Sequence, residues 1–299
     1  MLVPGIAAVA AFRLLLGVGA GGFWSLAATV GMRLAPAEKL GRAIAIIFSG
    51  GSVATVMGLP LIGALSNVAD WHVALQTLAI LLAVLLLVQG VLLPAMAPAT
   101  SPSLASLASA FALRPLRQVL YATLFLVAGQ FCAYTFFTAS LQQRLSMTPM
   151  RVEMALWVFG TSCVAGPFVF ARMTSAAPAG MLLRALLGMG VAAVGLRSET
   201  GSSIPAFVAI TAWGMFWGAV PTTLQMWCLK SSGDAPELGS ALFVSAFQAS
   251  LGLGAAIGGQ LVHRLGISWA NSGSLVLWLA GAATLGCFAT DRPGRAAQR

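Results

Sequence analysis

The chain has 299 residues and a formal net charge of +9, yet only 8% of its residues are charged and 59% are apolar. Its mean hydropathy of +0.93 excludes a water-soluble globular domain, because roughly a quarter of the residues in such a domain are charged. The positive charges separate apolar runs and do not form a stripe with interleaved aromatic side chains, so they do not indicate a nucleic-acid interface.

Cysteine and histidine usage argues against a metal site or an enzyme. The four cysteines lie within apolar runs, and their spacing does not match a metal site. We expect them to be small buried side chains without a disulfide. The two histidines, His72 and His263, stand at the ends of predicted spans without a nucleophile or zinc-binding pattern. The sequence therefore predicts no catalytic activity and no cofactor.

Apolar runs long enough to cross a bilayer recur along the chain. A membrane-spanning helix needs roughly 20 mostly apolar residues, and on this criterion the sequence predicts about nine spans. We expect them near residues 5–32, 43–66, 73–94, 118–142, 152–171, 179–196, 204–229, 238–262 and 271–290. Residues 95–117 are rich in Pro and Ser, which is typical of a linker between two bundles. The predicted organisation is therefore a partial N-terminal bundle of three helices (1–94), a cytoplasmic linker (95–117) and a complete six-helix C-terminal bundle (118–299).

Lys and Arg residues predict the orientation, because the cytoplasmic loops of membrane proteins are enriched in them. One set of alternating loops carries Arg33, Lys39, Arg42, Arg114, Arg117, Arg172, Arg184, Lys230, Arg292, Arg295 and Arg299. The other set carries only Arg144, Arg151, Arg197 and Arg264. We therefore expect a multi-pass protein of the cell inner (plasma) membrane, with the N-terminus outside and the linker and C-terminus in the cytoplasm.

Two distant stretches of the chain repeat the same pattern. An apolar run extends from Gly41 to Trp71, and another of equal length extends from Gly239 to Trp269. A Phe-Trp pair precedes each run, at Trp24 in one case and Trp217 in the other. This parallel repeat predicts two similar halves, an arrangement found in major facilitator transporters. The repeated unit includes the span with the Phe-Trp pair, so span 5–32 matches 204–229 and span 43–66 matches 238–262. The second half has three spans before this unit and the first half has none, so the spans are expected to correspond to helices 4–12 of a twelve-helix, all-α fold.

Four sequence blocks resemble the major facilitator superfamily. Arg13, followed by a small-residue run from Gly17 to Gly21, resembles the fourth-helix signature of its drug and sugar efflux antiporters. Residues 58–63 are similar to a reduced Gly/Pro antiporter signature of the fifth helix, carried by Gly58, Pro60 and Gly63. Closer still, residues 21–28 (Gly-Gly-Phe-Trp-Ser-Leu-Ala-Ala) and 128–131 (Ala-Gly-Gln-Phe) resemble the purine ribonucleoside efflux branch. The first three helices of that family have no counterpart in this sequence.

The resemblance implies a proton-coupled efflux transporter that works by alternating access. In the family the arginine at the position of Arg13 is linked to proton movement, and a cation inside a span marks a functional site by default. The competing interpretation is that Arg13 reaches the outer interface. The resemblance assigns close contact with the opposite bundle to Gly58, Pro60 and Gly63, although ordinary helix packing explains them equally well. Glu153 is expected to be an interfacial carboxylate and not a proton carrier.

Polar and aromatic side chains at helical spacing are the candidates for substrate contact. Gln130 and Tyr134 share one helix face, as do Trp217 and Gln225 with their neighbours. Trp24 and Ser25 occupy the matching place in the first half of the repeat. Amide and hydroxyl groups could hydrogen-bond ribose or base edges, and the rings could stack on a base. The alternative for the tryptophans is contact with lipid or neighbouring helices.

The sequence favours export of purine ribonucleosides, with the substrate and protons as partners, the lipid bilayer as surroundings and a monomer as the functional unit. A sugar or drug efflux permease of the same superfamily is the first alternative. A truncated, non-transporting membrane protein is the second, because a bundle without its first helices would lack part of the cavity wall.

Overall fold

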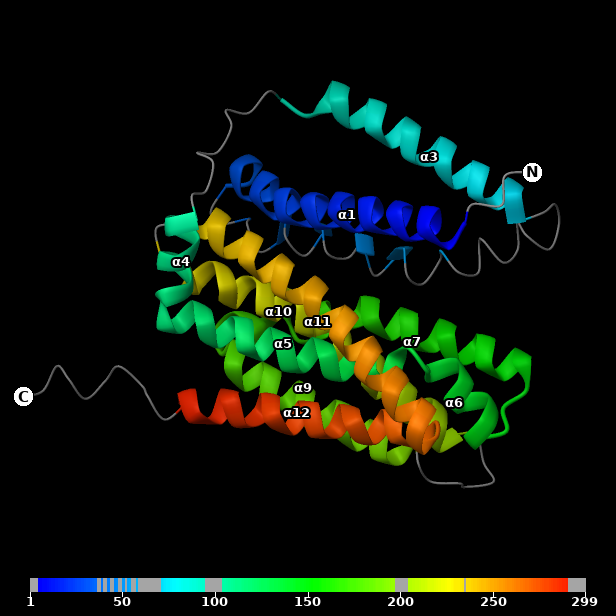
Figure 1. The fold of residues 1–299 in the computed structure, drawn as a ribbon. Helices are drawn as coiled ribbons and strands as arrows, with labels where there is room; N and C mark the ends of the chain where they lie inside the picture. The colour runs from blue at the N-terminus through cyan, green and yellow to red at the C-terminus, as the bar shows by residue number, and fades with distance from the viewer. Residues whose placement is uncertain are drawn as a thin grey trace, which may run out of the picture.

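The computed structural model describes residues 5–36, 39, 42–43, 46–47, 50–51, 53–54, 58, 71–94, 104–196, 204–233 and 235–289. All regular elements in these ranges are helices (Figure 1). This confirms the predicted all-α polytopic class. Six described helices are long and apolar enough to cross a membrane, and α1 contains a shorter apolar stretch from Leu14 to Trp24.

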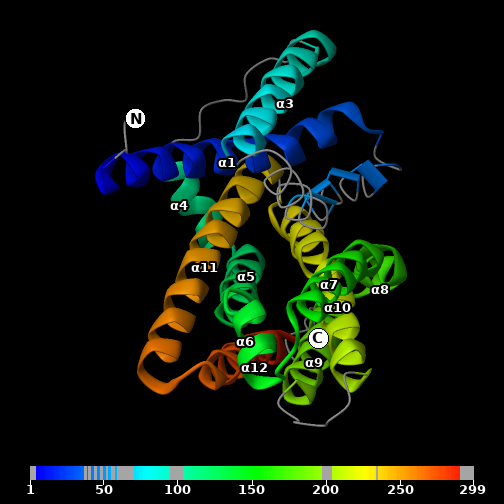
Figure 2. The same cartoon turned by 90° about the vertical axis from the view of Figure 1, so that its right-hand side faces the viewer.

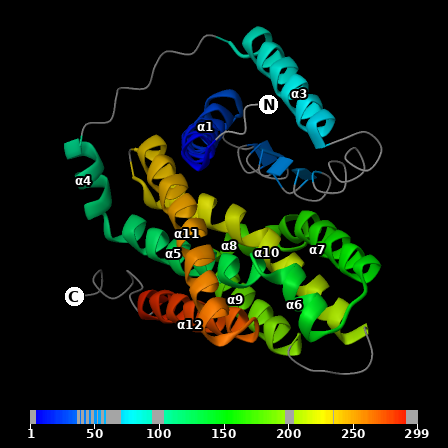
Figure 3. The same cartoon turned by 45° about the vertical axis from the view of Figure 1, so that its right-hand side comes forward.

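The N-terminal part contributes the long helices α1 (Ile6–Leu34) and α3 (Trp71–Leu92), which match the spans expected at 5–32 and 73–94. They lie together on one side of the helices that follow (Figures 1 and 3). The span expected at 43–66 falls mostly outside the described residues. No residue of α3's most apolar stretch is buried, which fits a helix whose solvent is lipid hydrocarbon.

The segment predicted as a linker contains a short helix, α4 (Leu104–Ala112), and the first residues of α5 (Arg114–Tyr134). Pro115 stands in the first turn of α5, where its missing N–H removes no intrahelical bond and its fixed φ favours the helix. The proline therefore starts the span four residues earlier than the sequence analysis placed it, at 114 and not at 118.

The span expected at 118–142 is divided into α5 and the short helix α6 (Phe137–Arg144). The division falls at Thr135 and Phe136. The Thr135 hydroxyl donates a 2.6 Å hydrogen bond to the Phe131 carbonyl, a local bond that competes with the helical ladder and bends helices. Apolar composition continues through this break, so hydropathy alone gave one helix.

The remaining helices are α7 (Pro149–Val169), the short α8 (Ala171–Ala176), α9 (Pro178–Gly195), α10 (Ile204–Ser231), α11 (Pro236–Leu265) and α12 (Ser268–Ala289). They agree with the five spans predicted after residue 150 to within a few residues. In chain order α5 and α7 to α12 form one bundle, green to red in Figure 2.

Glycines bring two pairs of helices into close contact. On α10, a Cβ at Gly214 or Gly218 would overlap backbone atoms of α7, at Phe159 and Cys163. On α11, a Cβ at Gly254 or Gly258 would overlap the backbone of α5. Because lipid tails are as apolar as the helices, van der Waals contact of this kind is a main source of helix association in membranes.

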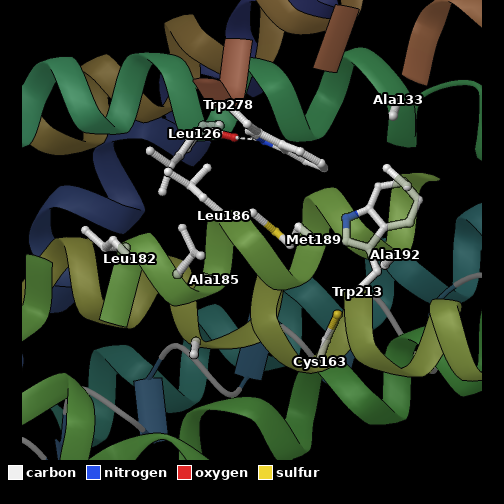
Figure 4. Close-up of a cluster of buried hydrophobic side chains, with 14 of the residues drawn as sticks. Leu126, Ala133, Cys163, Leu182, Ala185, Leu186, Met189, Ala192, Trp213 and Trp278 are labelled. Carbon is white, nitrogen blue, oxygen red and sulfur yellow. Dashed lines mark hydrogen bonds between the residues drawn. The ribbon is translucent and has the colours of Figure 1, made fainter. Parts of the chain in front are cut away.

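The core of the bundle lies between α5, α9, α10 and α12 (Figure 4). Met189 of α9 and Trp213 of α10 are almost fully buried there. Trp278 of α12 is also buried, and its Nε1 donates a 3.2 Å hydrogen bond to the carbonyl of Leu126 on α5 (Figure 4). The indole therefore fills the core without leaving its polar atom unsatisfied.

Candidate functional site

A cavity of about 360 Å³ lies between the N-terminal helices and the C-terminal bundle. Its described lining comes from α1, the segment around Gly51, α5, α7, α10 and α11, and consists of Trp24, Gly51, Phe131, Tyr134, Phe159, Gly160, Cys163, Pro167, Trp217, Gly218, Pro221, Thr222, Phe243, Val244, Phe247, Gln248 and Leu251. The volume is within the range of small-molecule sites, roughly 300–1,000 Å³.

Seven of the described lining residues are aromatic. The Tyr134 ring stacks on Phe159, with centroids 5.0 Å apart. The Trp217 ring meets Phe131 edge to face at 6.1 Å. Ring pairs in these arrangements are favourable beyond the area they bury, so the wall is a rigid apolar surface suited to a planar or apolar ligand face.

Two prolines lie where α7 and α10 border the cavity, Pro167 and Pro221. A proline inside a helix removes the hydrogen bond to the carbonyl four residues earlier. For Pro167 that carbonyl belongs to Cys163, and it packs against the Cα of Gly218 on the facing helix. A weak Cα–H···O contact can occupy such an oxygen, and Gly218 permits the close approach.

The polar groups of the wall are uncharged. Tyr134, Thr222 and Gln248 make no hydrogen bond with another described residue through their side chains, and none of the described lining residues is an Asp, Glu, Lys, Arg or His. Besides the indole rings, the lining side chains therefore offer two hydroxyls, one amide and the Cys163 thiol, and no full charge. This combination excludes strong selection for an ionic ligand by the described part of the site.

Three of the predicted substrate residues border this cavity: Trp24, Tyr134 and Trp217. Trp24 and Trp217 are the two tryptophans that the repeat placed in matching positions, and they reach the same space from α1 and from α10. Trp24 touches the position of Gly51, where a Cβ would lie 3.0 Å from the indole ring. The side chains of Ser25 and Arg13 lie outside the described part of the structure.

The two predicted glutamines lie between helices and not in the cavity wall. Gln130 is fully buried, and its Oε1 accepts a 2.8 Å hydrogen bond from Trp213 Nε1. Gln225 is also fully buried, and its Nε2 donates to Ser240 Oγ at 3.0 Å. Each amide therefore joins two helices, α5 to α10 and α10 to α11. One atom of each amide thus finds a protein partner, whereas Gln130 Nε2 and Gln225 Oε1 have none among the described residues; a role of either glutamine in substrate binding stays a prediction.

Of the predicted antiporter residues, Gly58 is helical and half-buried, with no atom within 4 Å of where its Cβ would stand. Pro60 and Gly63 lie outside the described residues. The described structure therefore shows no close helix contact at Gly58, and the assignment of this group stays a prediction.

Gln248 and Thr222 are lining residues that the sequence analysis did not select. Gln248 follows Phe247, which stands one helical turn after Phe243 and one before Leu251, so these residues share one face of α11. The sequence feature that could have pointed to Gln248 is a glutamine inside the predicted span 238–262. This feature does not by itself identify a cavity residue, because Gln130 and Gln225 are also glutamines within apolar spans and contact other helices.

An ion pair joins the N-terminal helices to the C-terminal bundle. Arg33 Nη2 lies 2.8 Å from Glu237 Oε1, and both side chains are about one-third exposed. Arg33 belongs to the last turn of α1 and Glu237 to the first turn of α11. Each charge thus also complements the dipole of its own helix. α1 contacts α11 along this region.

Reversing one charge of this pair is expected to weaken the contact between α1 and α11. Arg33→Glu should lower the free energy of unfolding by up to about 1 kcal/mol, because exposed ion pairs contribute little. Arg33→Glu with Glu237→Arg should recover most of the loss, whereas Glu153→Arg with Arg33→Glu should not. Thermal denaturation of the purified variants in detergent at low and high salt measures both effects. Equal stability of the single and the double variant would show that the pair contributes nothing.

Comparisons with known proteins agree with this architecture. The family model of the Major Facilitator Superfamily matches residues 1–241. A "Probable sugar efflux transporter" of Mannheimia succiniciproducens is 28% identical over 82% of this chain and 62% of its own length. A Pseudomonas aeruginosa protein named "Transcription regulatory protein OpdE" is 31% identical over 85% of this chain and 64% of its own length. The chain therefore spans less than two thirds of these relatives.

Among solved structures, the fold is similar to that of FucP, a major facilitator transporter crystallised in the outward conformation. The TM-score is 0.63 at 17% identity, over 88% of this chain and 71% of that one. At this identity the likeness concerns the fold alone. The family model extends from the first residue through α10 into α11, across the helices that enclose the cavity. On this match the chain is a multi-pass membrane protein that belongs to the Major Facilitator Superfamily.

Proposed function

We propose that the protein is a secondary transporter that exports a small uncharged solute by alternating access, with purine ribonucleosides as its substrates. The observation that carries this proposal is the cavity between the two groups of helices, which has an aromatic wall and uncharged polar groups. A purine can stack on the rings of Trp217, Phe131 or Tyr134. Its base edge and ribose can take hydrogen bonds from hydroxyl and amide groups.

Sugar export is the second candidate, and the names of the relatives favour it. A free sugar carries hydroxyl groups around its whole rim, and each one that loses water without a partner costs free energy. The described wall offers few polar side chains and many rings. This balance favours a ligand with one large apolar face, which a nucleoside has.

Arg13 is our candidate for proton coupling, and Gly58, Pro60 and Gly63 are candidates for the contact between the bundles. The proposed location is the inner membrane, with the Arg33–Glu237 end of the molecule facing the cytoplasm. Breaking this ion pair would accompany opening of the cavity toward that side. We propose that one copy of the chain is the functional unit.

Expression of the full chain in cells is expected to lower their accumulation of labelled inosine, and collapse of the proton gradient should remove the difference. Trp217→Ala should weaken this export by up to about tenfold, because it removes an aromatic stacking contact of roughly 0.5–1.5 kcal/mol. Trp269→Ala, on an exposed tryptophan outside the described cavity lining, is the matched control.

Cells with well-expressed protein and unchanged inosine accumulation would exclude the nucleoside assignment. Reduced accumulation of a labelled sugar in the same cells would then support the second candidate. If neither solute is affected, the non-transporting alternative from the sequence stands in place of both.

A further inference from the structure

Gln248 differs from Gln130 and Gln225, the two described glutamines that are fully buried within helices. The Gln130 and Gln225 amides are fully buried and bonded to side chains of neighbouring helices. The Gln248 side chain borders the cavity, is half-buried and makes no hydrogen bond with another described residue. Each of the first two amides has one atom bonded to a neighbouring helix, while Gln130 Nε2 and Gln225 Oε1 have no partner among the described residues. Neither amide atom of Gln248 has a bond to protein in the described part of the chain.

An amide in this position has a specific chemical capacity. Its carbonyl oxygen accepts and its NH₂ group donates, side by side in one plane. Because the rest of the described wall is aromatic, aliphatic or hydroxyl-bearing, no other described lining side chain offers such a planar donor–acceptor pair. This pair matches the edge of a heteroaromatic ring, as glutamine pairs with the edge of adenine in DNA recognition.

We propose that Gln248 is the specificity-determining residue of the cavity and reads the hydrogen-bonding edge of a planar, uncharged ring held between the aromatic side chains. This inference rests on the transport function proposed above. Without ligand, the amide of Gln248 is hydrogen-bonded to water. A ring with a complementary edge replaces that water at little cost, whereas a ring without one leaves the amide unsatisfied.

Thr222 supports the same arrangement from the facing helix. It is on α10, one residue after Pro221, and its side chain is 7% exposed while it still borders the cavity. One hydroxyl on α10 and one amide on α11 thus both border the cavity as polar groups available to the ligand. Gln248, and not Thr222, is assigned the recognition of the ring edge, because only its amide can donate and accept hydrogen bonds side by side.

The test compares two ligands that differ only at the ring edge. Inosine carries a 6-oxo group and an N1–H, and purine riboside lacks both. Binding to the purified full chain is measured by the change in tryptophan fluorescence, because Trp24 and Trp217 border the site. The native protein is expected to bind inosine about tenfold more tightly than purine riboside, the factor expected for a satisfied against an unsatisfied amide.

Gln248→Leu is expected to bring the affinities for inosine and purine riboside to within about twofold of each other, because it removes both the bond to inosine and the unsatisfied amide left by purine riboside. Gln248→Glu keeps an acceptor for the N1–H of inosine but loses the donor for its 6-oxo group, so it should reduce the preference without abolishing it. Gln260→Leu is the matched control, because Gln260 is an exposed residue of the same helix outside the described lining. It should retain the tenfold ratio.

A preserved ratio in both Gln248 variants, or an equal loss for both ligands, would overturn the specificity role and leave nucleoside transport standing. The same holds if the native protein binds both ligands equally. If the native protein binds neither one, both the role of Gln248 and the proposed substrate class fail.

Discussion

Replacing Gly218 with valine is expected to prevent α7 and α10 from packing and to leave little folded protein. A Cβ at this position would overlap the carbonyl and Cα of Cys163, which are backbone atoms and cannot rotate away. Overpacking against movable side chains costs about 1–3 kcal/mol, so a clash with backbone should reach or exceed the upper end. The yield of monodisperse protein after detergent extraction and its thermal midpoint measure this effect.

Gly252 provides the control for this substitution. It is a helical glycine of α11 with no atom within 4 Å of its Cβ position. Gly252→Val changes helix propensity and side-chain size as Gly218→Val does, but the new side chain extends into open space. We expect it to extract and melt like the native protein. Similar behaviour of the two variants would show that the close contact at Gly218 does not support the bundle.

Trp213→Ala is expected to destabilise the bundle by about 3 kcal/mol or more, the usual cost of removing a large core ring. The indole is 1% exposed and meets Phe137, Phe159 and Trp278 edge to face. Its loss also removes the donor that Gln130 Oε1 accepts from. Because Phe159 stacks on Tyr134, the disturbance should extend to the cavity wall and weaken inosine binding.

Trp213→Phe separates the contribution of ring packing from that of the hydrogen bond to Gln130. The ring contacts are largely kept and the hydrogen bond is lost, so the Gln130 amide is left buried without this partner. We expect an intermediate loss of about 1–2 kcal/mol. Adding Gln130→Leu should recover part of it, because the orphaned amide is removed. A double-mutant cycle of thermal stability measures the coupling, and strict additivity would contradict a direct bond between these side chains.

The helical class and most helix positions followed from the sequence, because a bilayer leaves only one solution for a long apolar run. Backbone N–H and C=O groups have no water to bond in hydrocarbon, so such a run must form a helix. The predictions failed where local chemistry outweighed hydropathy. Pro115 opened α5 early, and α5 ended at Tyr134, before the predicted span did. Both effects act over one turn, which a window of about 20 residues averages out.

The candidate site was only partly accessible from the sequence. Gln130, Gln225 and Gln248 give the same signal, an amide within an apolar run, and each one requires a partner. Which partner it finds depends on the side chain of another helix. Trp213 meets Gln130 across 83 positions of sequence, whereas Gln248 meets the cavity. No local pattern encodes that difference.

The sequence by itself predicted two similar halves, since the Phe-Trp pairs at 23–24 and 216–217 introduce matching apolar runs. The tertiary structure decided that Trp24 and Trp217 border one cavity. The physical reason is that periodicity defines a face within one helix, while the packing of several helices decides whether that face meets lipid, protein or an open space. Close approach at glycines such as Gly218 sets this packing.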